Sequence, residues 1–138
     1  MKQISTRFSI AVHALSLIAA SPQDCTGDFI ASSVNTNPVI IRRIIGMLKK
    51  AGLVEVRPGV GGATLLKDPD RITLLDVYRA VNATEEKQLF RIHDHPNLAC
   101  PVGRNIEQVL QTELSDAQSL LEARLAQTTL DQLLDKFK

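Results

Sequence analysis

The chain has 138 residues, of which 44% are hydrophobic and 22% charged, and its formal net charge is +1 at pH 7. This composition excludes a disordered or fibrous protein, and the length suits one globular domain or one domain with an appended helical segment. The near-neutral charge excludes a nucleic-acid binder of the strongly basic kind. Because no apolar run approaches the roughly 18 residues of a membrane span, we expect a cytoplasmic protein.

The N-terminal segment predicts an amphipathic helix that ends by Pro22, and Ser5 or Thr6 can cap its start. A basic residue followed by apolar residues is also typical of a signal peptide, but His13 and Ser16 interrupt the apolar stretch. The apolar residues recur on one helical face, which we expect to pack inward: Phe8, Ala11, Val12, Leu15, Ile18 and Ala19.

A second short helix is predicted from about Thr26 to Val34, followed by a polar turn at residues 35–37. A third helix then begins sharply, because Asn37 can cap it and a proline at its first position, Pro38, loses no hydrogen bond there. Three helices with a short turn between the second and third form a helix-turn-helix, in which the third is the recognition helix.

The third helix divides into an apolar and a basic face on a helical wheel. The apolar face holds Ile41, Ile44, Ile45 and Leu48, and the opposite face holds Val39, Arg42, Arg43, Gly46 and Lys50. Arginine bonds to guanine or phosphate, valine can contact a thymine methyl group, and glycine allows close approach, so the second face suits a DNA groove. A solvated basic face on a core helix is the alternative.

A β-hairpin is predicted directly after this helix, because Gly52 can end the helix and two short apolar runs, residues 53–56 and 64–66, flank a glycine-rich tip. A nucleotide-binding P-loop is excluded, since Gly62 is followed by Ala63 and a strand instead of a lysine, a hydroxyl residue and a helix. Helix and hairpin together predict a winged helix-turn-helix. Its expected DNA contacts are Asn37, Val39, Arg42, Arg43, Lys50, Arg57, Gly59 and Gly61.

The charges are unevenly distributed along the chain. Residues 1–62 hold seven basic and three acidic side chains, and residues 63–138 hold nine basic and twelve acidic ones, so +4 stands beside −3. Clustered cations, rather than the charge of a whole chain, give affinity for the phosphate backbone. The asymmetry favours a DNA-facing head on an acidic body, although chance fluctuation in a short chain would also produce it.

A long helix is predicted from Gly103 to about Gln127. Its apolar residues recur at three- and four-residue steps, as in a coiled-coil seam: Ile106, Leu110, Leu114, Ala117, Leu121 and Leu125. At about 37 Å in length, the seam is too long for one small head to cover, so we expect a second copy of the chain to cover it. A final short helix from Thr128 is expected to pack back across the pair. A helical hairpin within a monomer is the alternative.

The predicted fold class is mainly α with a small β-wing. Residues 1–80 form a winged helix-turn-helix DNA-binding domain, residues 81–102 a linker or sensor loop, and residues 103–138 a helical dimerisation segment. A two-fold axis along the long helix would present two recognition helices to a pseudo-palindromic site on double-stranded DNA.

Four segments match one known protein family from end to end of the chain. They are ISTRFSIAVHALSLIA near the start, the Asn37-Pro38 helix with LKKAGLVE, the wing RPGVGGATLLKDPDRITLLDVYRAV, and CPVG at residues 100–103. The chain thereby resembles the Rrf-type family of bacterial winged-helix transcriptional regulators, the group that includes IscR, NsrR and CymR. The resemblance implies a homodimer on a palindromic operator, with the third helix in the major groove and the wing toward the minor groove.

Two positions depart from the family pattern. Ala63 stands where many relatives carry an aromatic residue after the paired glycines, and the loop before the long helix has Cys100 alone where iron-sulfur members have three cysteines. One thiolate cannot hold a cluster that normally needs three or four protein ligands. We therefore predict no iron-sulfur cluster and assign no other cofactor.

Cys100 is the leading candidate for a sensor residue. It lies at the start of the long helix, where amide dipoles lower a thiol pKa and favour the reactive thiolate. A redox switch could use Cys100 alone or pair it with Cys25 of the same or the other subunit, with His93 and His95 nearby in the sequence. A plain thiol is the alternative. Residues 93–95 and Cys100 form no recognised zinc spacing, so no metal site is predicted.

No enzyme is predicted, because the sequence contains no recognisable catalytic triad, paired carboxylates or cofactor fingerprint. We expect a sequence-specific DNA-binding transcriptional regulator, a homodimeric repressor with a redox-responsive thiol as the leading hypothesis for its signal. The alternative is a winged-helix dimer that acts as a protein-interaction module without binding DNA. Exposure of Arg42 and Arg43 would favour DNA, and their pairing with acids of the C-terminal body would favour protein interaction.

Overall fold

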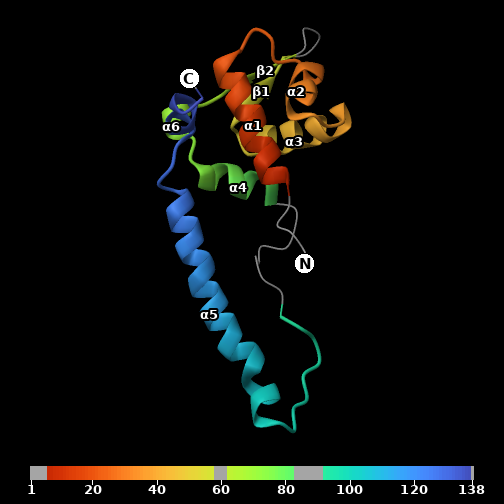
Figure 1. Cartoon of the computed structure of the whole chain (residues 1–138), viewed down its shortest axis with the longest axis vertical. Helices are drawn as coiled ribbons and strands as arrows, with labels where there is room; N and C mark the ends of the chain where they lie inside the picture. The colour runs from red at the N-terminus through yellow and green to blue at the C-terminus, as the bar shows by residue number, and fades with distance from the viewer. Residues whose placement is uncertain (1–5, 58–61, 83–91, 138) are drawn as a thin grey trace.

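The computed structural model describes residues 6–57, 62–82 and 92–137, and in them a helical head carries one long projecting helix (Figure 1). The elements follow in the order α1 (Arg7–Ala20), α2 (Gly27–Val34), α3 (Pro38–Lys50), β1 (Val54–Val56), β2 (Ala63–Leu65), a 3-10 turn η1 (Pro69–Arg71), α4 (Leu74–Asn82), α5 (Pro101–Leu125) and α6 (Leu130–Asp135). The predicted fold class, mainly α with a small β-wing, is confirmed. Within these ranges, no helix is both long and apolar enough to cross a membrane.

Helix α1 lies at the centre of the head and carries the predicted inward stripe. Ala11, Leu15 and Ile18 are buried, and they contribute to one core with residues of α2, α3, the wing, α4 and α6. Thr6 does stand at the cap position, but its backbone is helical and its side chain makes no capping hydrogen bond. The expectation that Thr6 caps α1 is therefore wrong, and Ser5 lies outside the described residues.

The turn between α2 and α3 is built by local hydrogen bonds. The hydroxyl oxygen of Thr26 caps α2 by accepting from the amide of Phe29 at 3.2 Å. Asn35 adopts a left-handed conformation, with φ 65°, and ends that helix. The Oδ1 atom of Asn37 then accepts from the amide of Val39 at 2.8 Å, which starts α3 at Pro38 as predicted.

The wing is a two-stranded antiparallel sheet directly after α3. Gly52, with φ 79°, turns the chain out of the helix. Val54 then pairs with Leu65, Glu55 with Thr64, and Val56 with Ala63. Ala63 is buried, so the wing packs on the head through a small side chain. The tip of the wing, residues 58–61, lies outside the described residues.

Helix α4 had no predicted counterpart among the elements, although it carries its own start signal. The hydroxyl of Thr73 accepts from the amide of Asp76 at 3.1 Å, and the Asp76 carboxylate accepts from the amide of Thr73 at 3.0 Å. This reciprocal capping box satisfies two amides that a helix start would leave unpaired. Val77 and Val81 of α4 are buried in the head core.

Helix α6 exists as predicted, and it packs on the head of its own chain. It packs on α1 and η1 of its own chain (Figure 1). The amide of Leu130 donates to the carbonyl of Ile72 at 2.7 Å, and the amide of Leu74 donates to the carbonyl of Thr128 at 2.9 Å. Because Leu130 is also buried in the head core, α6 belongs to the head.

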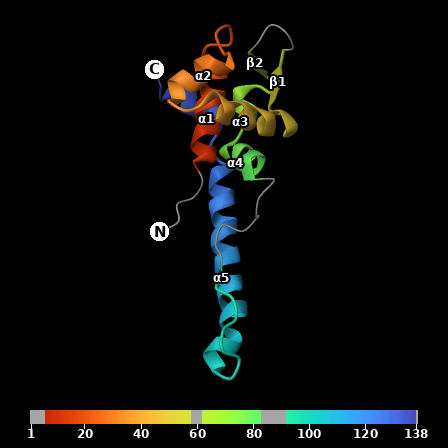
Figure 2. The same cartoon turned by 90° about the vertical axis from the view of Figure 1, so that its right-hand side faces the viewer.

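Helix α5 projects from the head as a rod and has no buried residue (Figure 2). The predicted seam is half-buried at Ile106, Leu110, Leu114, Leu121 and Leu125 and exposed at Ala117. Three further apolar side chains on this helix are exposed: Val102 by 69%, Val109 by 58% and Leu120 by 74%. The helix therefore presents an apolar surface that the head of its own chain leaves uncovered.

Candidate nucleic-acid interface

The predicted division of α3 into two faces is confirmed. Ile41, Ile44 and Leu48 are buried in the head core, and Ile45 is half-buried. The opposite face is exposed at every predicted position: Val39, Arg42, Arg43, Gly46 and Lys50. Inward packing of the isoleucines thus turns the basic side of α3 toward solvent.

The cations of this face are available for a partner. Arg42 and Arg43 are exposed, and no ion pair joins either one to an acid in the described part of the chain. Arg57 is exposed at the base of the wing, where its amide donates to the carbonyl of Gly62 at 3.2 Å. The other two predicted wing contacts, Gly59 and Gly61, lie outside the described residues.

The structure adds to the predicted site at three residues. One gains a structural role, and two were not predicted to belong to the face. Asn37 uses its side-chain oxygen to cap α3, so it has a structural role in addition to any contact with a partner. Ile40, 38% exposed, and Lys49, also exposed, flank the predicted face and extend it on both sides. The helical wheel could have indicated both residues, because each lies within about 100° of Val39 in a helix of 3.6 residues per turn.

Cys100 is exposed at the start of α5. The backbone amides of Gly103 and Val102 face its sulfur and lower the pKa of the thiol, because they stabilise the thiolate. The loop before it packs closely, and a Cβ atom on Gly103 would collide with the carbonyl oxygen of Asn97. His93 and His95 in the same loop are exposed.

Cys25 has the opposite environment. It is buried in the turn before α2, its thiol donates to the carbonyl of Ser21 at 3.1 Å, and burial together with the negative charge of Asp24 raises its pKa. This turn and the start of α5 lie at opposite ends of the molecule (Figure 1). A pairing of Cys100 with Cys25 of the same chain is therefore wrong.

The donor set does not fit an iron centre. Within the described ranges, no group of three or more histidine, cysteine or acidic side chains lies close enough to bind a metal ion. The whole chain has two cysteines, and they lie at opposite ends of the molecule (Figure 1). Iron-sulfur clusters are normally held by four thiolates or by a mixed set of similar size.

The turn between α2 and α3, the exposed α3 face and the hairpin behind it define a winged helix-turn-helix protein. Residues 4–136 match the model of the Rrf2 family, described as iron-dependent transcriptional regulators. The chain belongs to the Rrf2 family of transcriptional regulators.

Two proteins of Bacillus subtilis (strain 168) are similar in sequence, and both are classed as HTH-type transcriptional regulators. YwnA is 45% identical over 132 residues, which cover 96% of this chain and 97% of YwnA. YwgB is 38% identical over 74 residues, which cover 51% of this chain and 47% of YwgB.

Solved structures share the fold. The crystal structure of a protein described as DNA-binding is 41% identical, with a TM-score of 0.76 over 93% of this chain and 98% of that one. IscR of T. potens gives a TM-score of 0.71 at 22% identity, covering 99% of this chain and 89% of IscR. CymR of B. subtilis gives 0.67 at 23% identity, covering 99% and 98%. The last two likenesses concern the fold alone.

The two thiols should react with iodoacetamide at different pH values. We expect the alkylation rate of Cys100 to reach half its maximum at a pH below that of an ordinary thiol, because the thiolate is the nucleophile and its pKa is lowered. Cys25 should react slowly and only at higher pH, because its pKa is raised. Mass spectrometry of Cys25→Ser and Cys100→Ser proteins separates the two rates. A midpoint for Cys100 at or above that of free cysteine would contradict the assignment.

Proposed function

We propose that this regulator is a homodimer that binds a pseudo-palindromic operator and represses transcription by occupying it. The observation that carries the proposal is the exposed basic face of α3, which the buried Ile41, Ile44 and Leu48 hold in place. Helices presented in this way enter the major groove of DNA. The wing, with Arg57 at its base, would reach toward the adjacent minor groove.

The residues of this surface divide into those suited to contact bases and those suited to contact phosphates. Arg42 and Arg43 can each bond in bidentate fashion to a guanine, and Val39 can contact a thymine methyl group. Gly46 supports close approach, because it is exposed and has no side chain to separate the helix from the groove. Lys50 and Arg57 lie at the end of the helix and at the wing, where they suit contacts to phosphate.

Helix α5 supports the dimer. Its apolar seam and the exposed Val102, Val109 and Leu120 form a broad apolar surface that its own head leaves uncovered. Large uncovered apolar surfaces are rare on monomers and mark interfaces. Pairing of two such rods along a two-fold axis would bury this surface and place two heads on one DNA face.

Arg42→Ala combined with Arg43→Ala should strongly weaken specific DNA binding. If the two arginines together lose about 2 kcal/mol of base contacts, the affinity falls about thirtyfold. Electrophoretic shift with fragments selected from the source genome by the wild-type protein measures the effect. Arg71→Ala, at an exposed arginine on η1, is the matched control and should bind normally. Unchanged binding by the double variant would reject Arg42 and Arg43 as the DNA-contacting residues. A wild-type protein that selects and binds no fragment would reject the DNA assignment and favour a protein-interaction module.

Leu114→Glu should convert the dimer to a monomer. The substitution places a charge in the middle of the seam, where a paired rod would bury it without a partner. Sedimentation equilibrium at micromolar concentration gives the mass. Ser115→Glu is the control, because Ser115 is exposed about 100° further around the same helix. A Leu114→Glu protein that remains dimeric would place the interface elsewhere.

We further propose that oxidation of Cys100 is the signal. Its thiolate would attack the O–O bond of a peroxide and take one oxygen; the sulfur is oxidised by two electrons to sulfenic acid, and the peroxide is reduced to water or an alcohol. Exposure and a lowered pKa support this reactivity. Because Cys100 stands at the N-terminal end of α5, the helix that carries the seam, its oxidation would disturb the pairing of the two α5 helices and so the spacing of the heads.

Hydrogen peroxide should weaken operator binding by the wild-type protein and leave Cys100→Ser unaffected. Cys25→Ser should respond as the wild type does, because buried Cys25 takes no part. The same electrophoretic assay measures all three proteins, and mass spectrometry reports the added oxygen. A Cys100→Ser protein that still loses DNA on oxidation would show that Cys100 is not the sensor.

A further inference from the structure

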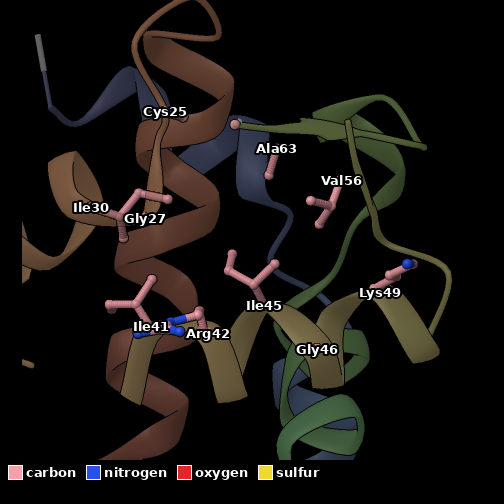
Figure 3. A pocket seen from close by; sticks show the side chains of 11 residues that line it. Cys25, Gly27, Ile30, Ile41, Arg42, Ile45, Gly46, Lys49, Val56 and Ala63 are labelled. Carbon is pink, nitrogen blue, oxygen red and sulfur yellow. The ribbon is translucent and has the colours of Figure 1, made fainter. Parts of the chain in front are cut away.

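A hollow of about 280 Å³ separates α3 from the wing (Figure 3). Helix α3 lies along one side, the start of α2 along another, and strands β1 and β2 face α3 across the space. Its walls are mostly apolar. The residues that line it are Cys25, Gly27, Ile30, Ile41, Arg42, Ile45, Gly46, Lys49, Val56, Gly62 and Ala63.

The hollow exists because small residues meet at three walls. Gly27 comes from α2, Gly46 from α3, and Ala63 from β2. A Cβ atom built at Gly27 or at Gly46 meets no other atom within 4 Å, so neither position is crowded. Val56 and Ala63 are strand partners and point from the wing toward Ile45 of α3 (Figure 3). The side chains of the head therefore leave this space unfilled.

The charges at the hollow have one sign. Arg42 and Lys49 contribute the cations, and the described residues that line the space include no acidic side chain. Both cations are exposed, and they lie at opposite ends of the hollow (Figure 3). An apolar space with cations at its ends is complementary to a ligand with an apolar body and an anionic end.

We propose that this hollow is a binding site for a small aromatic carboxylate. A cavity of about 150 Å³ already holds a benzene-sized molecule, so 280 Å³ accommodates one ring with a short acidic substituent. The ring lies between Ile45 and the pair Val56 and Ala63. The carboxylate lies at the Arg42 end of the hollow and pairs with that guanidinium, and Lys49 adds positive charge at the opposite end.

A bound acid would act on the proposed DNA-binding activity. Arg42 and Gly46 belong both to the hollow and to the exposed face of α3. A carboxylate paired with Arg42 removes that side chain from a guanine, and its negative charge repels the phosphates that would lie beside it. The acid and the operator therefore compete. This regulatory consequence rests on the proposed function, whereas the binding site itself does not.

Benzoate is the probe, tested on the full-length protein without DNA. Titration followed by methyl NMR should shift the signals of Ala63, Val56 and Ile45 and give a saturable dissociation constant. Benzamide, which has the same shape without the charge, should bind about tenfold more weakly, because a charge-assisted hydrogen bond is lost. Shifts located elsewhere, or equal affinity for the two compounds, would overturn the proposal.

Two variants fill the hollow from different walls. Ala63→Phe adds a ring from β2, and Gly27→Leu adds a side chain from α2 into space that the structure leaves open. Each should weaken benzoate binding at least about tenfold. Ser32→Leu, at an exposed position of α2, is the control and should bind benzoate as the wild type does. Normal benzoate affinity in a folded filling variant, with folding checked by its melting temperature, would overturn the site.

The DNA arm of the experiment separates the two proposals. Benzoate should release selected DNA from the wild-type protein at concentrations that fill the hollow, and Gly27→Leu should retain its DNA. If benzoate binds but the wild-type protein never binds DNA, the proposed function fails and the site stands. If DNA binds normally and benzoate produces no methyl shifts, the site fails and the proposed function stands.

Discussion

The packing of α3 on the head core is the constraint on which the rest of the structure depends. Ile41, Ile44 and Leu48 are buried almost completely, and each such side chain contributes about 1.5–3 kcal/mol on burial. Helix α3 cannot roll about its axis without exposing them. Their position therefore fixes which side of the helix faces solvent, where the wing begins after Gly52, and how wide the space between helix and wing is.

The parts of the fold that local chemistry decides were predictable from the sequence. The start of α3 follows from the Asn37 cap, and its end follows from Gly52. Helix α4 was predictable in the same way, since the capping box of Thr73 and Asp76 is a sequence signal. The position of α6 was not, because it depends on contacts of Leu130 with residues far away in the chain, and periodicity carries no information about such partners.

The candidate site shows the same limit. The exposed basic face of α3 followed from helical spacing alone, and the lowered pKa of Cys100 followed from its place at a helix start. The pairing of Cys100 with Cys25 of the same chain failed because a sequence gives no distance between two loops. The hollow beside the wing could not be predicted either. It arises because Gly27, Gly46 and Ala63 have small side chains or none, and these three positions come together only in the folded protein.

Backbone hydrogen bonds join the head to the connection that follows α5. Thr73 pairs with Thr129, and one backbone hydrogen bond on each side joins residues 128–130, which follow α5, to residues 72–74 at the start of α4. One residue inserted into α5 between this junction and the paired seam would rotate each head by about 100° around the rod. In the proposed dimer, heads that met one side of a double helix would then point away from it. The length of α5 would therefore set the relative orientation of the two α3 faces and would tolerate change only in whole turns.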